Sequence, residues 1–313
     1  MPYQGSKNKI AEWVISNLPP GDVLVDLFAG GCAITHAALV SGNYKKVIAN
    51  DITDVPSLFV DAVNGKFANE KRWISREDFF KHKDTEPYVS LCWSFGNNRR
   101  NYMYSKEIEP WKKALHFARV LDDFSLFEQM QINTDGSNRD IIKNQDDYRR
   151  KYIEWFLNHF KNDPKINSRL HELESLQRLQ SLQRLQSLQS LESLQRLESL
   201  QSLQRLEVHR MSYNQVDIPN GAIVYADPPY RGTDIKGYLN TFDWEAFDEW
   251  LEYTPFMVII SEYTAPRGCV EVANISKLNQ FGNNHKTIER LFVQKRFFNQ
   301  YCEMMRTKNL FYF

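Results

Sequence analysis

Residues 22–51 read DVLVDLFAGGCAITHAALVSGNYKKVIAND, and this stretch decides the fold. Its opening part, 22–30, predicts a short apolar strand that ends in an acid and glycines. A helix is expected over 32–42, closed by Gly42, and a second strand over 45–51 also ends in an acid. Strand, helix and strand at this spacing predict a right-handed parallel βαβ unit.

The same pattern returns in the last third of the chain. The residues at 221–229 predict a strand, those at 243–252 a helix and those at 255–261 another strand. Near the start of the chain, the apolar residues at 6–18 have helical spacing, which predicts a helix with Ser6 as its N-cap. These segments together predict one α/β domain.

A different kind of sequence separates the two α/β parts. It is rich in aromatic and charged residues, and it has helical segments at 109–121 and 146–160 without a sheet pattern. We therefore expect a catalytic domain made of 1–63 and 208–313, interrupted by a mainly helical lobe at 64–172.

A leucine recurs at every third position from Leu173 to Leu206, in triplets such as LQR, LQS and LES. Triplets advance by about 300° on an α-helix, so the leucines circle the helix instead of forming one apolar stripe. The composition favours a long helix, and partial disorder or a stacked solenoid are the open alternatives. We expect 173–207 to be a spacer outside the catalytic machinery, since it contains no histidine, cysteine or aspartate.

The composition narrows the class of protein. The 313 residues carry no net charge at neutral pH, so nothing global indicates a nucleic-acid partner. The four cysteines lie far apart without a CxxC pair, which fits reduced thiols better than disulfides or a zinc site. No apolar run approaches a membrane span, and the start of the chain lacks a signal-peptide core. We expect a soluble, cytoplasmic protein without a metal.

A rigid polar tetrapeptide follows the strand near residue 225: Asp227, Pro228, Pro229 and Tyr230. The carboxyl edge of a parallel sheet is where such folds bind ligands. The prolines fix the backbone and lack N–H donors, so Asp227 and the Pro228 carbonyl can accept hydrogen bonds beside the ring of Tyr230. That arrangement suits the exocyclic amine of a planar base, because it frees the lone pair of the amine for attack. The alternative is a strand exit followed by an ordinary Pro-Pro turn.

Three further segments fit a nucleotide-like ligand at this edge. DLFAGG, at 26–31, is a glycine-bearing turn that lets a ligand approach the backbone. Asp51 ends the second strand, where an acid can bind ribose hydroxyls; the alternative is an N-cap of the next helix. YQGSK, at 3–7, puts an aromatic residue and Lys7 before a helix and can clamp a nucleoside or a carboxylate; the alternative is an exposed terminus.

In order and in content these segments resemble the DNA adenine-N6 methyltransferases. PYQGSK is similar to the N-terminal motif of that family, LVDLFAGGCAI to its S-adenosylmethionine loop, IANDI to its acidic second-strand motif and IVYADPPYRGT to its catalytic motif. YLNTFDWEAFDEWL, VIISEY and NHKTIERLFV resemble the segments that follow. The resemblance covers about 1–60 and 208–295. It implies a Rossmann-like methyltransferase fold, with a mixed seven-stranded sheet and an inserted recognition lobe.

The resemblance also implies roles for individual residues. Asp227, Pro228, Pro229 and Tyr230 would form the catalytic site that holds a flipped adenine. One departure is that Gly30 is followed directly by another glycine and then a cysteine, whereas the family often has a G-x-G pattern. The expected contacts of S-adenosylmethionine are Tyr3, Lys7, Asp26, Phe28, Gly30, Asp51, Asp227 and Phe242.

The inserted lobe supplies the candidate DNA contacts. The stretch at 95–113, FGNNRRNYMYSKEIEPWKK, interleaves basic residues that suit phosphates with Tyr102, Tyr104 and Trp111, which suit unstacked bases. The alternative is a solvated surface over buried aromatic residues. The candidate basic residues are Arg99, Arg100, Lys106 and Lys112.

We therefore expect a monomeric DNA methyltransferase of the restriction–modification type, encoded by a bacterial host or a phage. It would transfer a methyl group from S-adenosylmethionine to N6 of adenine in duplex DNA by base flipping, without a covalent intermediate. Two alternatives stay open: the same chemistry on RNA or on a protein amide, and an inactive scaffold that assembles through the leucine triplets. Related enzymes that methylate amides usually have Asn rather than Asp before the prolines, and the intact tetrapeptide, Asp51 and Lys7 argue against inactivity.

Overall fold

The computed structural model describes residues 5–132, 134, 136–143, 203–231, 242–278 and 286–310. The chain divides into two compact units, and each has its own hydrophobic core. Unit 1 comprises Met1–Gly65 and Ser190–Phe313, and unit 2 comprises Lys66–Gln189. The helix expected at 146–160 and the repeat up to residue 202 lie outside the described residues.

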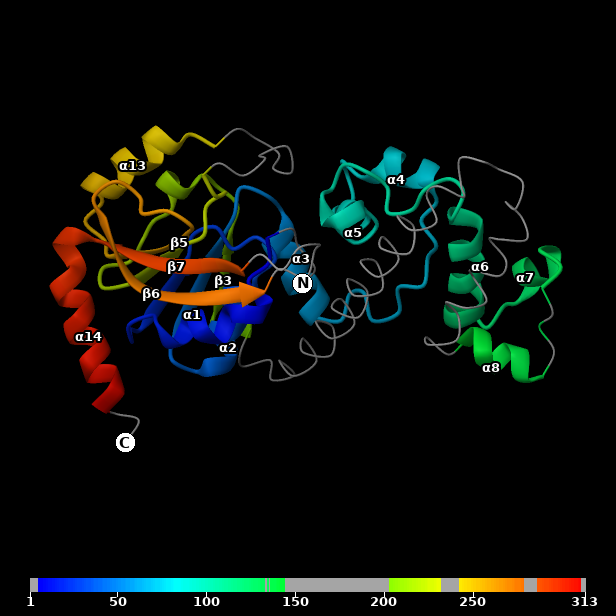
Figure 1. Ribbon diagram of the computed structural model, residues 1–313, viewed down its shortest axis with the longest axis horizontal. Helices are drawn as coiled ribbons and strands as arrows, with labels where there is room; N and C mark the ends of the chain where they lie inside the picture. The colour runs from blue at the N-terminus through cyan, green and yellow to red at the C-terminus, as the bar shows by residue number, and fades with distance from the viewer. Residues whose placement is uncertain are drawn as a thin grey trace. The chain divides into compact units, whose positions relative to one another are not determined.

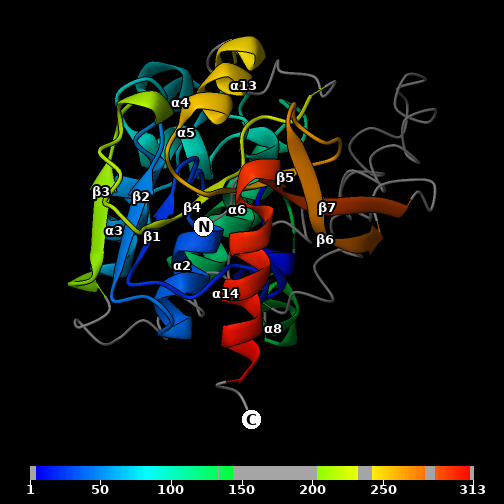
Figure 2. The same cartoon turned by 90° about the vertical axis from the view of Figure 1, so that its left-hand side faces the viewer.

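A seven-stranded sheet organises the described part of unit 1 (Figures 1 and 2), in the order β3-β2-β1-β4-β5-β7-β6. From β3 to β5 the neighbours pair in parallel, while β7 runs antiparallel to β5, and β6 antiparallel to β7. The expected α/β class and mixed sheet are confirmed. The strands are β1 (Val23–Asp26), β2 (Lys46–Asn50), β3 (Leu206–His209), β4 (Ile223–Ala226), β5 (Val258–Glu262), β6 (Cys269–Leu278) and β7 (Lys286–Gln294).

The βαβ unit forms as predicted. α2 (Ala33–Ser41) joins β1 to β2, and Gly42 follows it with a φ of 70°, in the left-handed region that favours glycine. β1 then pairs with β2 on one side and with β4 on the other, so it lies inside the sheet. Both faces of such a strand are covered, which explains why these strands read as apolar runs rather than as alternating patterns.

Helices complete unit 1. A 3-10 turn, η1 (Asn8–Ile10), precedes α1 (Ala11–Ser16), so the expected helix at 6–18 is shorter than predicted. Ser6 Oγ accepts from the Asn8 N–H at 3.4 Å, but the N-cap of α1 is Ile10, so the expected N-cap role of Ser6 is wrong. The remaining elements are α3 (Val55–Val63), η3 (Tyr213–Gln215), α13 (Trp244–Tyr253), η5 (Lys295–Phe297) and α14 (Phe298–Leu310).

The last two residues of the leucine repeat, Leu206 and Glu207, belong to β3 in the sheet. Leu206 pairs with Val47 in the parallel register of β3 and β2. The preceding Arg205 donates from its guanidinium to the Tyr44 carbonyl at 3.0 Å and to the Leu39 carbonyl at 2.8 Å. A four-residue edge strand was hidden in the sequence because its first leucine continues the triplet spacing.

Unit 2 is helical over its described part, and α6 (Glu109–Val120) confirms the helix predicted at 109–121. Its core contains the large side chains of Phe79, Tyr102, Trp111 and Phe127. The other helical elements are α4 (Arg76–His82), α5 (Pro87–Cys92), η2 (Phe95–Asn97), α7 (Ser125–Gln129) and α8 (Ser137–Lys143).

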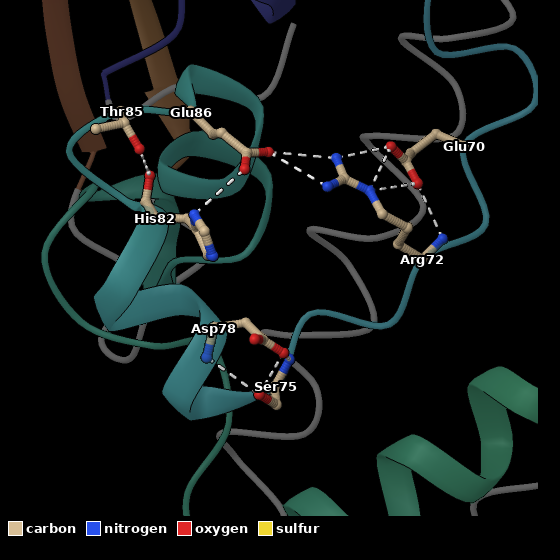
Figure 3. Close-up of polar contacts among 7 residues, drawn as sticks. All are labelled: Glu70, Arg72, Ser75, Asp78, His82, Thr85 and Glu86. Carbon is tan, nitrogen blue, oxygen red and sulfur yellow. Dashed lines mark hydrogen bonds and ion pairs between the residues drawn. The ribbon is translucent and has the colours of Figure 1, made fainter.

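Polar contacts fix where α4 and α5 begin (Figure 3). Ser75 and Asp78 form a reciprocal capping box at the start of α4, with the Asp78 N–H donating to Ser75 Oγ at 3.1 Å. Arg72 donates to Glu70 Oε2 at 2.9 Å and reaches Glu86, the residue before α5, at 3.3 Å. The segment that leads into α4 is thereby tied to the start of α5.

Within the described residues, no helix has the length and apolar character that crossing a bilayer requires.

Candidate active site

Three acids meet at the carboxyl edge of the sheet. Asp26 is the last residue of β1, Asp51 directly follows β2, and Asp227 directly follows β4. β1 lies between β2 and β4 and runs parallel to both, so the three strands end at the same edge. The predicted acids are therefore brought together by the topology, at the place where open α/β sheets bind ligands.

Asp26 supports the loop between β1 and α2. Its Oδ2 accepts from the Thr35 N–H at 3.0 Å and from Thr35 Oγ1 at 2.6 Å. The side chain is buried, and burial raises its pKa to about 7, although the Thr35 hydroxyl acts in the opposite direction. Asp26, a predicted cofactor contact, thus uses its Oδ2 to anchor the start of α2 through Thr35.

Asp51 joins the two loops that follow β1 and β2. Its Oδ2 accepts from the Gly30 N–H at 2.9 Å, and its Oδ1 accepts from the Thr53 N–H at 2.8 Å and the Thr53 hydroxyl at 2.6 Å. The residue before α3 is Asp54, so the alternative interpretation of Asp51 as the N-cap of that helix is wrong. Gly30 itself has a φ of 46°, which explains a glycine at that position.

The tetrapeptide contacts the amino-terminal segment through Lys7. The Lys7 ammonium lies 3.1 Å from Asp227 Oδ1 and 4.4 Å from the centre of the Tyr230 ring. It also lies 3.3 Å from Oε1 of Glu289, on β7. Burial lowers the pKa of Lys7, but the attraction of the Asp227 and Glu289 carboxylates outweighs it, and the net effect is a raised pKa. Lys7 is therefore a buried cation shared by two carboxylates.

Tyr230 is held by its hydroxyl. That hydroxyl lies 2.8 Å from Ser261 Oγ, on β5, and donates to Glu289. Ser261 Oγ in turn donates to the same Glu289 oxygen at 2.7 Å. The edge of Tyr263 packs on the Tyr230 ring with a centroid distance of 4.5 Å, and only 8% of the Tyr230 side chain is exposed.

Glu289 and Ser261 are site residues that the sequence analysis missed. Glu289 is 1% exposed, and burial raises the pKa of its carboxyl to about 7, against the attraction of Lys7. A signal was present: strand periodicity places Glu289 on the same face as Leu291 and Val293, which are fully buried. A carboxylate on the apolar face of a strand needs polar partners.

Two predicted cofactor contacts, Phe28 and Phe242, lie together in an aromatic cluster. Their ring centroids are 5.7 Å apart and edge-on, and Tyr213, which the sequence analysis did not single out, packs on Phe28 at 5.6 Å. This cluster follows the β1 exit, so it gives an apolar wall beside the acids. Tyr3 lies outside the described residues.

Arg231 fixes the exit of the tetrapeptide. Its backbone N–H donates to Glu262 Oε2 at 3.1 Å, and its guanidinium donates to Asp248 Oδ1 at 2.5 Å while lying over the Trp244 ring. The backbone beyond Tyr230 is thus tied to both β5 and α13.

The predicted DNA contacts in unit 2 are only partly at its surface. Lys106 is exposed and Arg100 is half-buried, whereas Arg99 uses its guanidinium to donate to Ser90 Oγ at 3.2 Å. Lys112 is 7% exposed, and its ammonium lies over the Tyr104 ring. Because Lys112 is buried, little of its side chain is accessible to a phosphate.

The aromatic residues interleaved with these cations are core residues. Tyr102, Tyr104 and Trp111 are all buried in unit 2. The expectation that they stack on unstacked bases is wrong in this structure, and the alternative of buried aromatic residues is the one observed. The burial of Trp111 could have been predicted from helix periodicity over 109–120, which places Trp111 on the same face as Leu115.

Among the residues that the structure describes, no cluster of three or more His, Cys, Asp or Glu side chains could hold a metal ion.

Two comparisons with known proteins bear on this site. Residues 3–122 match the sequence profile of the D12 class N6 adenine-specific DNA methyltransferases. The chain is also similar to the Type II methyltransferase M2.HphI of Haemophilus parahaemolyticus, with 46% identity over 55 residues. That alignment covers 17% of this chain and 16% of the relative. The resemblance recognised from the motifs is thereby confirmed for the amino-terminal part of the chain, including Lys7 and Asp51.

Proposed function

We propose that this chain is a site-specific DNA methyltransferase that moves a methyl group from S-adenosylmethionine to the N6 amine of adenine. The observation that carries the proposal is the 3.1 Å contact between Lys7 and Asp227. Lys7 lies within residues 3–122, which match the D12 class profile, whereas the tetrapeptide that begins at Asp227 lies outside that range. The contact therefore joins the two segments. The two motifs therefore act at one edge of one sheet.

The residues at this edge fit S-adenosylmethionine. Lys7 and Asp227 carry opposite charges that suit the carboxylate and the ammonium of its amino-acid part. Asp51 is positioned at the end of β2, where an acid can accept from ribose hydroxyls. Phe28 and Phe242 offer an apolar wall for a purine ring. When bound, the cofactor supplies an electrophilic methyl group on its sulfonium.

The tetrapeptide performs the chemistry on the base. Asp227 and the Pro228 carbonyl accept hydrogen bonds from the target amine, which localises the lone pair on N6. The Asp227 carboxylate also stabilises the positive charge that develops on that nitrogen during attack. A base inside a duplex cannot reach such an edge, so the target adenine is flipped out and stacked on Tyr230. Arg100 and Lys106 of unit 2 contact the DNA backbone.

The test is methyl transfer with an identified product. Purified protein is incubated with labelled S-adenosylmethionine and duplex DNA, RNA or a protein mixture, and the labelled product is digested and identified. We expect label in N6-methyladenine of duplex DNA. Replacing Asp227 by alanine should lower the rate by about a hundredfold or more, because a charge-stabilising acceptor is lost.

Asp217→Ala is the matched control, since Asp217 is exposed in the loop before β4. It should keep the wild-type rate. Label only in RNA or in a protein amide would favour the alternative substrates, and the absence of any transfer would favour the scaffold. A fully active Asp227→Ala variant would show that the catalytic site lies elsewhere.

A further inference from the structure

Lys7 occupies the position that the target amine needs. Its ammonium is 3.1 Å from Asp227 Oδ1, the acceptor assigned to the adenine amine, and it covers the face of Tyr230, the ring assigned to the base. An ammonium and an exocyclic amine are both N–H donors, so they compete for the same carboxylate. A carboxylate accepts several hydrogen bonds, so adenine can bind in the proposed way if Lys7 leaves Asp227 an acceptor position for the amine.

A buried cation cannot be released without a second partner. Lys7 is 8% exposed, and an isolated ammonium in such a place would pay a large desolvation penalty. Glu289 provides a partner within the protein, in addition to the proposed cofactor carboxylate, and lies 3.3 Å from the same nitrogen. The Asp227 side chain is 18% exposed, against 9% for the Lys7 side chain.

Glu289 is itself fixed in place. It lies in the middle of β7, and the same oxygen, Oε1, that faces Lys7 accepts from Ser261 Oγ at 2.7 Å and from the Tyr230 hydroxyl. Three donors from three separate segments therefore converge on one carboxylate oxygen. Such a group can keep Lys7 and Tyr230 in position while Asp227 changes its partner.

We propose that Glu289 is a positioning residue of the methyl-transfer site, whose carboxylate holds Lys7 and the Tyr230 hydroxyl in place so that Asp227 can accept the target amine. The inference rests on the proposed function and adds to it. Asp227 is the group that touches the base, and Glu289 acts through Lys7 and Tyr230.

The charge of Glu289 is what the inference depends on, so Glu289→Gln is the test variant. Glutamine keeps the size and an acceptor oxygen for Tyr230 and Ser261 but leaves Asp227 as the one carboxylate paired with Lys7. Single-turnover transfer from labelled S-adenosylmethionine to duplex DNA should slow by about tenfold or more. Glu271→Gln is the matched control: Glu271 is on neighbouring β6, is exposed and pairs with Arg290 at 3.2 Å. It should stay within about twofold of wild type.

A double-mutant cycle separates positioning from packing. In a Lys7→Gln background there is no ammonium to retain, so Glu289→Gln should change the residual rate by less than about twofold. Glu289→Asp keeps the charge and should retain more activity than Glu289→Gln; it also serves if the glutamine variant does not fold. The affinity for S-adenosylmethionine, measured by equilibrium dialysis, should fall less than the rate does in Glu289→Gln.

The outcomes are distinct. Wild-type protein that does not methylate DNA contradicts the proposed function. If wild type is active and Glu289→Gln matches Glu271→Gln, the positioning role is wrong while the function stands. An equal loss from Glu289→Gln in both backgrounds, or an aspartate variant no better than the glutamine variant, also overturns the inference, because Glu289 would then act through packing alone.

Discussion

At the scale of single residues, the edge of this sheet holds acids in very different settings. Asp51 accepts hydrogen bonds from backbone and hydroxyl donors, whereas Asp227 and Glu289 share one ammonium. Asp26 is the most deeply buried of the three strand-end acids, and burial raises its pKa to about 7. A carboxyl that prefers its neutral form in the fold makes stability depend on pH.

The Asp26 carboxyl predicts the sign of that dependence. Its pKa is 3.8 in the unfolded chain and about 7 in the fold, so the folded protein binds the extra proton between these values. The stabilising contribution is complete below about pH 4 and is lost as pH rises towards 7. The free energy of unfolding should fall by up to about 1.4 kcal/mol per pH unit across this window through this residue.

Asp26→Asn removes the titration and keeps an acceptor for Thr35. We expect denaturant unfolding at pH 5 and at pH 7 to differ less in the variant than in wild type. Asp22→Asn serves as the control, because Asp22 is exposed and pairs with exposed Lys45. If the free energy of unfolding changed equally with pH in wild type and in Asp26→Asn, Asp26 would be ionised in the fold over this pH range, stabilised by its hydrogen bonds from Thr35.

At the scale of elements, the sequence predicted the central strands well because burial on both faces makes them apolar throughout. β1, β4 and β5 are found where the apolar runs predicted them, each within a few residues. β3 was not predicted, since its leucine continued the triplet spacing of the repeat. The order of β6 and β7 was not predicted either, because adjacency in a sheet depends on long-range pairing that single-strand patterns do not contain.

The same limit explains which site residues were found. Asp51 and Asp227 end strands in apolar sequence, so position alone identified them. Glu289 lies within a strand far along the chain, and its role becomes visible only when β7 packs beside β5. Lys112 shows the reverse case, a predicted surface cation that helix packing buries.

One long-range element contact links the two ends of unit 1. The Lys308 ammonium, on α14, donates to the carbonyls of Ile15 at 2.9 Å, Ser16 at 2.9 Å and Leu18 at 2.8 Å. These carbonyls lie at the end of α1, where a helix leaves acceptors unsatisfied and favours a positive charge. α14 therefore caps the helix that follows the Lys7 segment.

Replacing Lys308 by methionine should destabilise unit 1. The substitution keeps the apolar stem but removes charged donors from three carbonyls, so we expect a loss of about 1.5–3 kcal/mol in the free energy of unfolding. Urea denaturation of the variant and of wild type measures this difference in the free energy of unfolding. Arg306→Met, at an exposed position on the same helix, should change stability by less than about 0.5 kcal/mol. Equal effects of the two substitutions would show that the cap contributes nothing beyond the helix itself.

At the scale of the whole molecule, chemistry and recognition are assigned to units with separate cores. Unit 1 holds Lys7, Asp227 and Glu289, and unit 2 holds the candidate DNA contacts Arg100 and Lys106. Separate cores also mean that damage to one unit need not abolish the other.

Trp111→Ala tests that independence. Trp111 is 1% exposed at the centre of the core of unit 2, and truncating a buried tryptophan typically costs about 3–5 kcal/mol. We expect DNA binding to fall sharply while the affinity for S-adenosylmethionine, measured by equilibrium dialysis, stays within about twofold of wild type, because the candidate cofactor contacts that the structure describes lie in unit 1. Phe80→Ala, at a side chain that is 49% exposed in the same unit, should leave both affinities unchanged. If Trp111→Ala abolishes cofactor binding as well, the two units fold as one cooperative structure, and the recognition lobe is required for the catalytic domain to form.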